Sequence, residues 1–240
     1  MSNVSERSPL AKPELKQPTD NSQLDSNISA LRERGELGVL FSILYEGAVE
    51  FEPVLADIVV RPSGADENPL LGQTGGFAVH SGKSESGKFE IVVNVDDGIT
   101  HYEGLLWSRR ASAVASMAKM GFDDTNLDAK WLSGFIFLHE LGHIVDYAKN
   151  YPNLTQKNKQ REAEMATLPV PGMSPPALRV KLESDPKWND WFVRAIPVLK
   201  HKYGVETVDE LIALQDSAYR STSMEDFADQ FAARVFKPYS

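Results

Sequence analysis

The chain has 240 residues, 42% of them hydrophobic, and a formal net charge of −9. This length supports one sizeable core, or one core with a small lobe. The negative charge argues against nucleic acid as a partner, because phosphate binding requires a basic surface. The absence of cysteine excludes disulfides and thiolate metal sites, and no apolar run reaches the roughly 18 residues that span a membrane.

The first 29 residues are rich in Ser, Asn, Pro, Lys and Glu and show no apolar periodicity. We predict a disordered tail over residues 1–29, followed by a single domain over residues 30–240. The tail lacks the apolar core of a secretory signal peptide. We therefore expect a cytoplasmic protein, or one exported without such a signal, for example into a host cell, and we expect a monomer.

The first half of the chain predicts a helix, a small sheet and a second helix. Apolar residues recur at helical spacing over 37–51. Residues 56–60, 75–80 and 88–95 have the composition of strands, and the turn-rich connection between the last two indicates a hairpin. The pattern over 102–120 is helical and ends at Gly121.

The second half predicts mainly helices. One begins at 127 or 128 and ends near 149, limited by Pro152. Segment 167–176 carries four prolines within eight positions, which favours a loop or a lid. Further helices are expected over 188–202, 207–218 and 224–236. This order predicts an α+β fold, in which a small mixed or mostly antiparallel sheet precedes a largely helical C-terminal half.

The most informative stretch is His139-Glu140-Leu141-Gly142-His143. In a helix, residues four apart lie on one face, so both imidazoles can reach one metal ion. A glutamate beside the first histidine can then accept a proton from a metal-bound water. The spacing therefore indicates a Zn²⁺ site with Glu140 as the catalytic acid and base.

The alternative is a solvated helix face that carries two unrelated histidines. The residues that flank the histidine motif argue against this alternative, because they are apolar nearly all round the helix, from Trp131 to Leu138 and again at Ile144 and Val145. Such a helix is normally buried, and polar groups in a buried helix need partners. A metal ion would be one such partner.

A catalytic zinc needs three protein ligands and one open position. The remaining histidines are weak candidates, because they fall in a predicted strand, a turn and a helix end: His80, His101 and His201. Glu225 is the stronger candidate. Asp229 lies four residues later on the same predicted helix and can accept the ring N–H of a ligand histidine. Carboxylates in a first helical turn can also simply complement the helix dipole.

Asp146 is the rival third ligand, since it stands three residues after His143 on the same helix. From His139 to Asp146 the helix rises about 10 Å, which is far for a short side chain to return. We interpret Asp146 as an outer-shell or helix-packing carboxylate.

Two segments resemble the catalytic domain of anthrax lethal factor and its relatives, which include small secreted endopeptidases that cut between prolines. The segments are His139-Glu140-x-Gly142-His143-x-Val145-Asp146-x-Ala148 and Glu225-x-Phe227-Ala228-x-x-Phe231. Together they cover about a tenth of the chain. Glu225 lies farther from His143 than is expected in these proteins, and the Pro-rich segment is the expected insertion, which leaves the subfamily open.

The resemblance implies a gluzincin-type zinc metalloendopeptidase with a zincin-like fold, in which Glu225 is the third ligand. It also implies a tyrosine shortly before that ligand, donating to the oxyanion. Tyr219 stands six residues before Glu225, where seven are expected. A phenol near the metal would stabilise the negative charge of the transition state. The other interpretation is a packing tyrosine at a helix end.

Zincins commonly hold an extended peptide along the edge strand of their sheet, with main-chain hydrogen bonds supplying affinity. We predict that the strand carrying Phe89, Ile91 and Val93 is this edge. The expected partner is a protein or peptide substrate.

Two other functions stay open at this stage. One is an intracellular regulatory protease that cuts a transcriptional repressor. The other is a catalytically silent module with structural zinc, although such zinc is normally held by four protein ligands.

Overall fold

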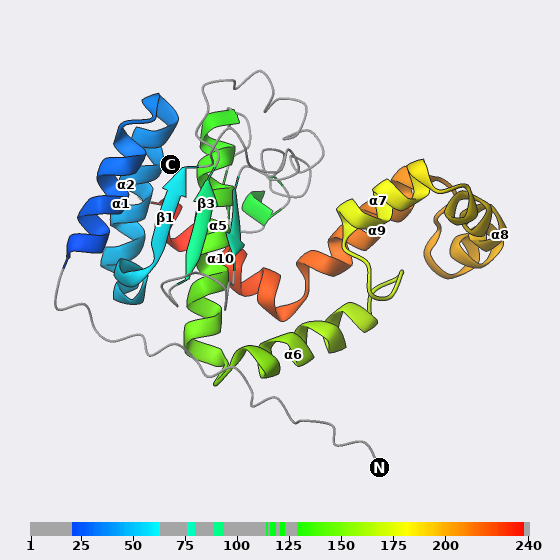
Figure 1. The fold of residues 1–240 in the computed structure, drawn as a ribbon. Coiled ribbons are helices and arrows are strands. Elements are labelled where there is room, and N and C mark those ends of the chain that lie inside the picture. Colours follow the sequence, from blue (N-terminus) through cyan, green and yellow to red (C-terminus); the bar gives the residue numbers. More distant parts are fainter. Residues whose placement is uncertain are drawn as a thin grey trace, which may run out of the picture. The chain divides into compact units, whose positions relative to one another are not determined.

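The computed structural model describes residues 21–62, 76–79, 89–93, 114, 116–118, 121–122 and 129–237. These residues form two compact units (Figure 1). The first takes the described residues up to Lys157 and those from Phe227 onward, and the second takes Asn158–Asp226. The single domain expected over 30–240 stays a prediction. The two units are defined by contacts between residues, and this division does not decide whether the chain works as one functional domain.

Two helices begin the first unit, α1 (Ser22–Arg32) and α2 (Gly35–Phe51). Helix α2 confirms the helix expected over 37–51. Helix α1 corrects the expected tail, since residues 22–29 are helical. Leu24, Ile28 and Leu31 pack against the core at spacings of four and three residues. This short apolar stripe forms a helix within a segment whose average composition is polar.

The sheet has three strands, β1 (Val59–Pro62), β2 (Gly76–Val79) and β3 (Glu90–Val93), in the order β1-β3-β2. β1 runs parallel to β3, whereas β2 runs antiparallel to it, as the expected hairpin requires. The sheet is therefore mixed. The strand expected over 56–60 begins later, because a 3₁₀-helix, η1 (Pro53–Asp57), occupies its first residues.

The prediction that β3 is the substrate-binding edge is wrong. This strand pairs with β1 on one side and with β2 on the other. The side chains of Phe89, Ile91 and Val93 are buried, with 6%, 0% and 0% exposure. An apolar run broken only by Glu90 is typical of an interior strand, and its backbone groups are already paired.

The outer side of β1 is covered by one side chain from α1. Asn27 donates from Nδ2 to the carbonyl of Ile58 at 2.8 Å and accepts from the amide of Val60 at 3.2 Å. These are the two bonds that a neighbouring strand would make. The same Nδ2 lies 3.0 Å from the hydroxyl of Tyr45, and the Asn27 side chain is buried. The edge of β1 is therefore closed to a further strand at this point.

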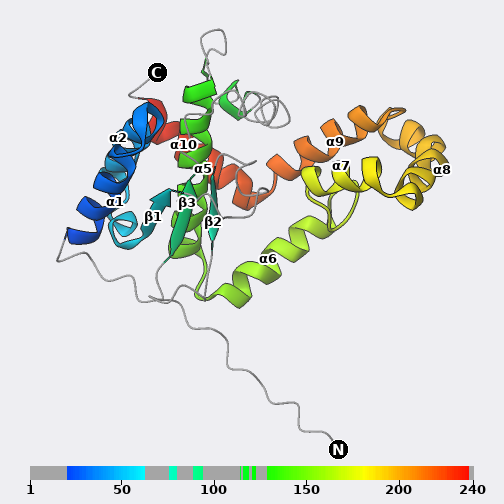
Figure 2. The same ribbon diagram turned by 45° about the horizontal axis from the view of Figure 1, so that its top comes forward.

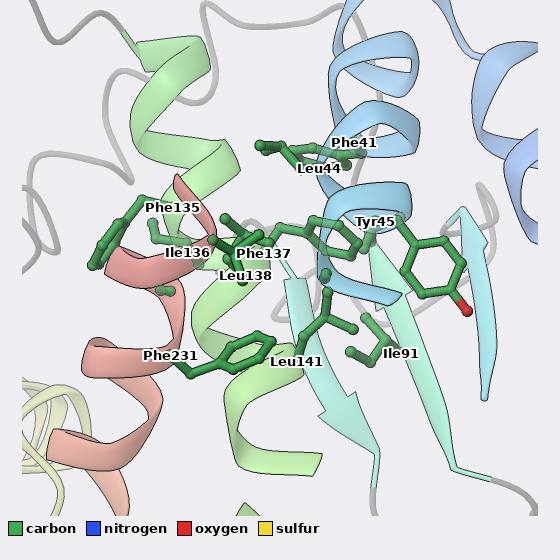
Figure 3. Packing of buried hydrophobic residues seen from close by; sticks show 14 of the residues in the cluster. Phe41, Leu44, Tyr45, Ile91, Phe135, Ile136, Phe137, Leu138, Leu141 and Phe231 are labelled. Carbon is green, nitrogen blue, oxygen red and sulfur yellow. The ribbon is translucent and has the colours of Figure 1, made fainter. Parts of the chain in front are cut away.

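Helix α5 (Ala129–Asn150) crosses the core and carries the histidine motif, where the sequence predicts a helix. It lies against β2, β3 and α2 (Figures 1 and 2). Figure 3 shows side chains from α2, β3, α5 and α10 (Ser223–Phe236) meeting in one hydrophobic cluster. Phe41 and Phe137 stack within it at 4.8 Å between ring centroids. The apolar surroundings of the motif are thus explained by burial on several sides.

The second unit is helical, with α6 (Leu154–Ala166), which begins in the first unit, α7 (Pro175–Ser184), α8 (Pro186–Tyr203) and α9 (Val208–Arg220). It has its own hydrophobic cluster, formed by Val170, Leu178, Leu182, Phe192, Leu199, Val205 and Leu211. Helices α8, α9 and α10 lie where the sequence predicts them. Helix α7 starts on two prolines, which the first helical turn tolerates because its amides need no partner within the helix.

The Pro-rich segment forms turns over residues 167–174 before α7 begins, as the expected loop requires. It is held by Gln215 of α9, a fully buried side chain. Gln215 accepts from the amide of Val170 at 2.8 Å and donates to the carbonyls of Val170 and Met173 at 2.9 and 2.7 Å. These bonds favour a fixed loop over a lid.

Candidate metal centre

Helix α5 places the two motif histidines one turn apart on one face. Their ring centroids lie 4.6 Å apart, and the ring planes are inclined by 82°. His139 is 6% exposed, and His143 is half-buried. The first imidazole is therefore shielded from solvent and the second only partly so.

Helix α10 supplies a carboxylate to these imidazoles. One nitrogen of each histidine and one oxygen of Glu225 all lie within 4.8 Å of one another. Donors about 2.0–2.2 Å from a tetrahedral zinc ion lie about 3.4 Å from one another, so the most widely spaced pair of donors would move together by up to about 1.4 Å when an ion binds. Two imidazoles and a carboxylate are a donor set that suits zinc. The residues therefore fit the ion that the motif implies.

Glu225 is placed by the helix on which it stands. The boundary between the two compact units falls inside α10, after Asp226. Glu225 and Asp229 are nevertheless one turn apart on this continuous helix. Asp229, one turn after Glu225, contacts His139 of α5.

The carboxylate of Asp229 forms a hydrogen bond with the first histidine. Its Oδ1 lies 2.7 Å from Nδ1 of His139, and its side chain is 5% exposed. Ser116 donates to the other carboxylate oxygen. With Nδ1 engaged in this way, Nε2 of His139 is the nitrogen available to a metal. The sequence anticipates Asp229, whereas Ser116 carries no signal beyond membership of a predicted helix.

Tyr219 lies beside Glu225. Burial raises the pKa of its phenol above the ordinary value, and the charge of Glu225 and a hydrogen bond with that carboxylate raise it further. The guanidinium groups of Arg161 and Arg220 partly oppose this shift. The phenol therefore stays protonated and can donate a hydrogen bond. Arg220 also approaches Glu225, with Nη1 3.6 Å from Oε2, and no sequence pattern points to it.

The rival ligand, Asp146, is buried but does not belong to the group of potential metal donors found in the described part of the chain. It accepts a hydrogen bond from Nδ2 of Asn150, one turn later on α5, at 2.7 Å. This contact agrees with a helix-packing carboxylate. Of the remaining histidines, His201 is exposed in α8, and the positions of His80 and His101 fall outside the described residues.

A buried lysine contacts the backbone of the second histidine. Lys157 is 4% exposed, and its Nζ lies 3.5 Å from the carbonyl oxygen of His143 and 5.4 Å from the ring centroid of Tyr147. The ammonium faces a carbonyl and an aromatic ring, both of which attract a cation. Lys157 thus joins the start of α6 to the middle of α5, and the sequence shows no pattern that singles it out.

Comparisons with known proteins identified no relative of this chain. No protein-family model matches the chain, and no curated protein or solved structure matches it either. None of the helices in the described residues combines the length and hydropathy needed to cross a membrane. The chain is thus shown to be a mostly helical protein with a small sheet, whose His139, His143 and Glu225 form a buried candidate metal site.

Proposed function

We propose that this protein is a zinc-dependent endopeptidase. The observation that carries the proposal is the convergence of His139, His143 and Glu225 within 4.8 Å, with Glu140 on the same helix turn. The resemblance of the two motif segments to gluzincins supports the same reading. The proposed substrate is a protein or peptide, and export into a host cell is part of the proposal.

The number of donors favours a catalytic site over a structural one. Structural zinc is normally enclosed by four protein ligands, whereas catalytic zinc has three and keeps one position open. Among the described residues the cluster holds three donors. When bound, zinc would lower the pKa of its water to about 7 and polarise the carbonyl of a peptide bond.

The side chains around the cluster then have distinct roles. Glu140, half-buried on α5, would take a proton from the attacking water and return it to the leaving amine. Asp229 would hold the ring of His139 in one tautomer. Tyr219, kept protonated, would donate to the developing oxyanion after exchanging its hydrogen bond with Glu225.

The proposed chemistry is tested by Glu140→Ala. We expect the variant to keep its zinc and its fold but to release no new peptide termini from a host-cell lysate in which the wild type does. The termini would be mapped by mass spectrometry. Glu162→Ala, at an exposed glutamate of α6, is the matched control and should cleave like the wild type. Cleavage by Glu140→Ala at the wild-type positions would refute the mechanism.

The third ligand is tested separately by Glu225→Ala, which should lose most of its zinc by elemental analysis. Asp226→Ala is the control, because Asp226 is the adjacent carboxylate on α10 and is exposed. Unchanged zinc content in Glu225→Ala would remove this residue from the site and return Asp146 to consideration.

A further inference from the structure

Two helices face each other at the candidate metal centre with matching residue spacings. Each contributes three residues at positions i, i+3 and i+4, which are neighbours on one helix face. In both sets the middle residue is small and the outer two are polar. The sets are His139, Gly142 and His143 on α5, and Glu225, Ala228 and Asp229 on α10.

The small residues mark a point where the two backbones come close together. A Cβ added at Gly142 would lie 2.8 Å from Cα and 3.0 Å from the carbonyl oxygen of Ala228, and 3.2 Å from Cβ of Phe231. Distances below 3.0 Å essentially do not occur for real Cβ atoms. The first two neighbours are backbone atoms of α10, so the helix itself would have to move. Ala228 is fully buried at this contact.

We propose that Gly142 is a positioning residue, which sets how closely α10 approaches α5 and thereby fixes the spacing of the metal donors. Near Gly142 and Ala228 in the chain, Nδ1 of His139 lies 2.7 Å from Oδ1 of Asp229, and the potential donor atoms of His139, His143 and Glu225 lie within 4.8 Å of one another. A side chain at position 142 would push α10 away from both imidazoles. The effect on metal binding rests on the proposed zinc site, whereas the effect on the bond between His139 and Asp229 does not.

Gly134 provides a matched comparison on the same helix. A Cβ added there would also come close to a neighbour, at 2.7 Å from Cδ1 of Leu44. That atom is the tip of a flexible side chain, which can rotate without moving a helix. Replacing glycine by alanine raises the intrinsic helix propensity by the same amount at both positions. Any difference between the two variants therefore reports on the contact between α5 and α10.

The test uses the full chain with Gly142→Ala and Gly134→Ala. In the metal-free protein, the hydrogen-bonded ring proton of His139 would be followed by NMR. We expect this signal in the wild type and in Gly134→Ala, and its loss in Gly142→Ala. Zinc affinity, measured by competition with a chelator, should fall at least about tenfold in Gly142→Ala, the range seen when support around a metal ligand is removed. It should be unchanged in Gly134→Ala.

A Gly142→Ala protein that keeps both the His139 proton signal and the wild-type zinc affinity would overturn the inference. A wild type that binds no zinc would instead refute the proposed function, and the NMR comparison would still decide on the helix contact. Should Gly142→Ala not fold, Ala228→Ser adds one atom at the fully buried residue of α10 whose backbone lies against Gly142. The same two measurements then apply, with loss of the proton signal expected and its retention contradicting the inference.

Discussion

At the scale of single residues, the site depends on two buried carboxylates that each have more than one partner. Asp229 accepts from Ser116 on one oxygen and bonds His139 on the other. Glu225 faces Arg220 and Tyr219 while it offers an oxygen to the donor cluster. The contacts on both oxygens fix the carboxylate of Asp229 in one orientation, because rotation would break both.

The importance of the charge on Asp229 is tested by Asp229→Asn. The amide oxygen can still accept from the ring of His139, but the negative charge that makes this ring a better ligand is lost. We expect zinc affinity to fall by about 10- to 100-fold, with an unchanged circular dichroism spectrum. Competition with a chelator measures the affinity, and Asp226→Asn serves as the control. Equal affinities for the two variants would show that the charge of Asp229 has no such role.

At the scale of elements, the Pro-rich segment depends on α9. Three hydrogen bonds join its backbone to the side chain of Gln215, and the hydrophobic cluster of the second unit includes its Val170. A buried amide or carbonyl that loses its partner costs about 1–3 kcal/mol. The loop is therefore anchored both by hydrogen bonds to a buried side chain and by apolar packing.

Gln215→Ala tests this anchor. We expect the free energy of unfolding to fall by about 2–4 kcal/mol, because several backbone groups lose their partner at once. Limited proteolysis should then cut within residues 167–174 faster than in the wild type. Ser217→Ala, at an exposed position of the same helix, is the control. Unchanged proteolysis and stability in Gln215→Ala would mean that these bonds do not hold the segment.

Sequence patterns predicted the elements that have strong apolar periodicity, such as α2, α5 and α9. They missed α1 and α6, whose composition is mostly polar, and α7, which starts on two prolines; the helical state of all three depends on contacts with the rest of the chain. The edge assignment of β3 failed for another reason. Strand order is a property of pairing between distant segments, and the composition of one strand does not contain it.

At the scale of the whole molecule, ionisation of buried tyrosines limits stability at high pH. Tyr45 lies in the main core, where its hydroxyl donates to the carbonyl of Leu55 at 2.7 Å. Burial raises its pKa above the ordinary value, and the nearby charge of Asp57 adds to this, whereas a hydrogen bond from Asn27 opposes it. The native state thus holds a proton that the unfolded chain releases above its ordinary pKa of about 10.

Ionisation of Tyr45 should accordingly leave the free energy of unfolding unchanged below pH 10 and lower it as the pH rises further, by about 1.4 kcal/mol per pH unit for this residue. Urea unfolding at a series of pH values from 8 to about 11.5 measures the slope. Tyr45→Phe should be less stable at pH 8, because the carbonyl of Leu55 loses a donor, but should show a shallower decline. Equal slopes for the two proteins would contradict the assignment.

The sequence by itself determined the features that depend on local spacing: two imidazoles on one helical face, a glutamate beside them, and a carboxylate pair on a later helix. A helix fixes the relation between residues i and i+4 wherever it lies. Only the tertiary structure decided that Glu225 and not Asp146 joins the histidines, that Asp229 meets His139, and that Gly142 lies against the backbone of α10. These relations depend on how closely two helices pack, and the spacing of residues within one helix does not contain that distance.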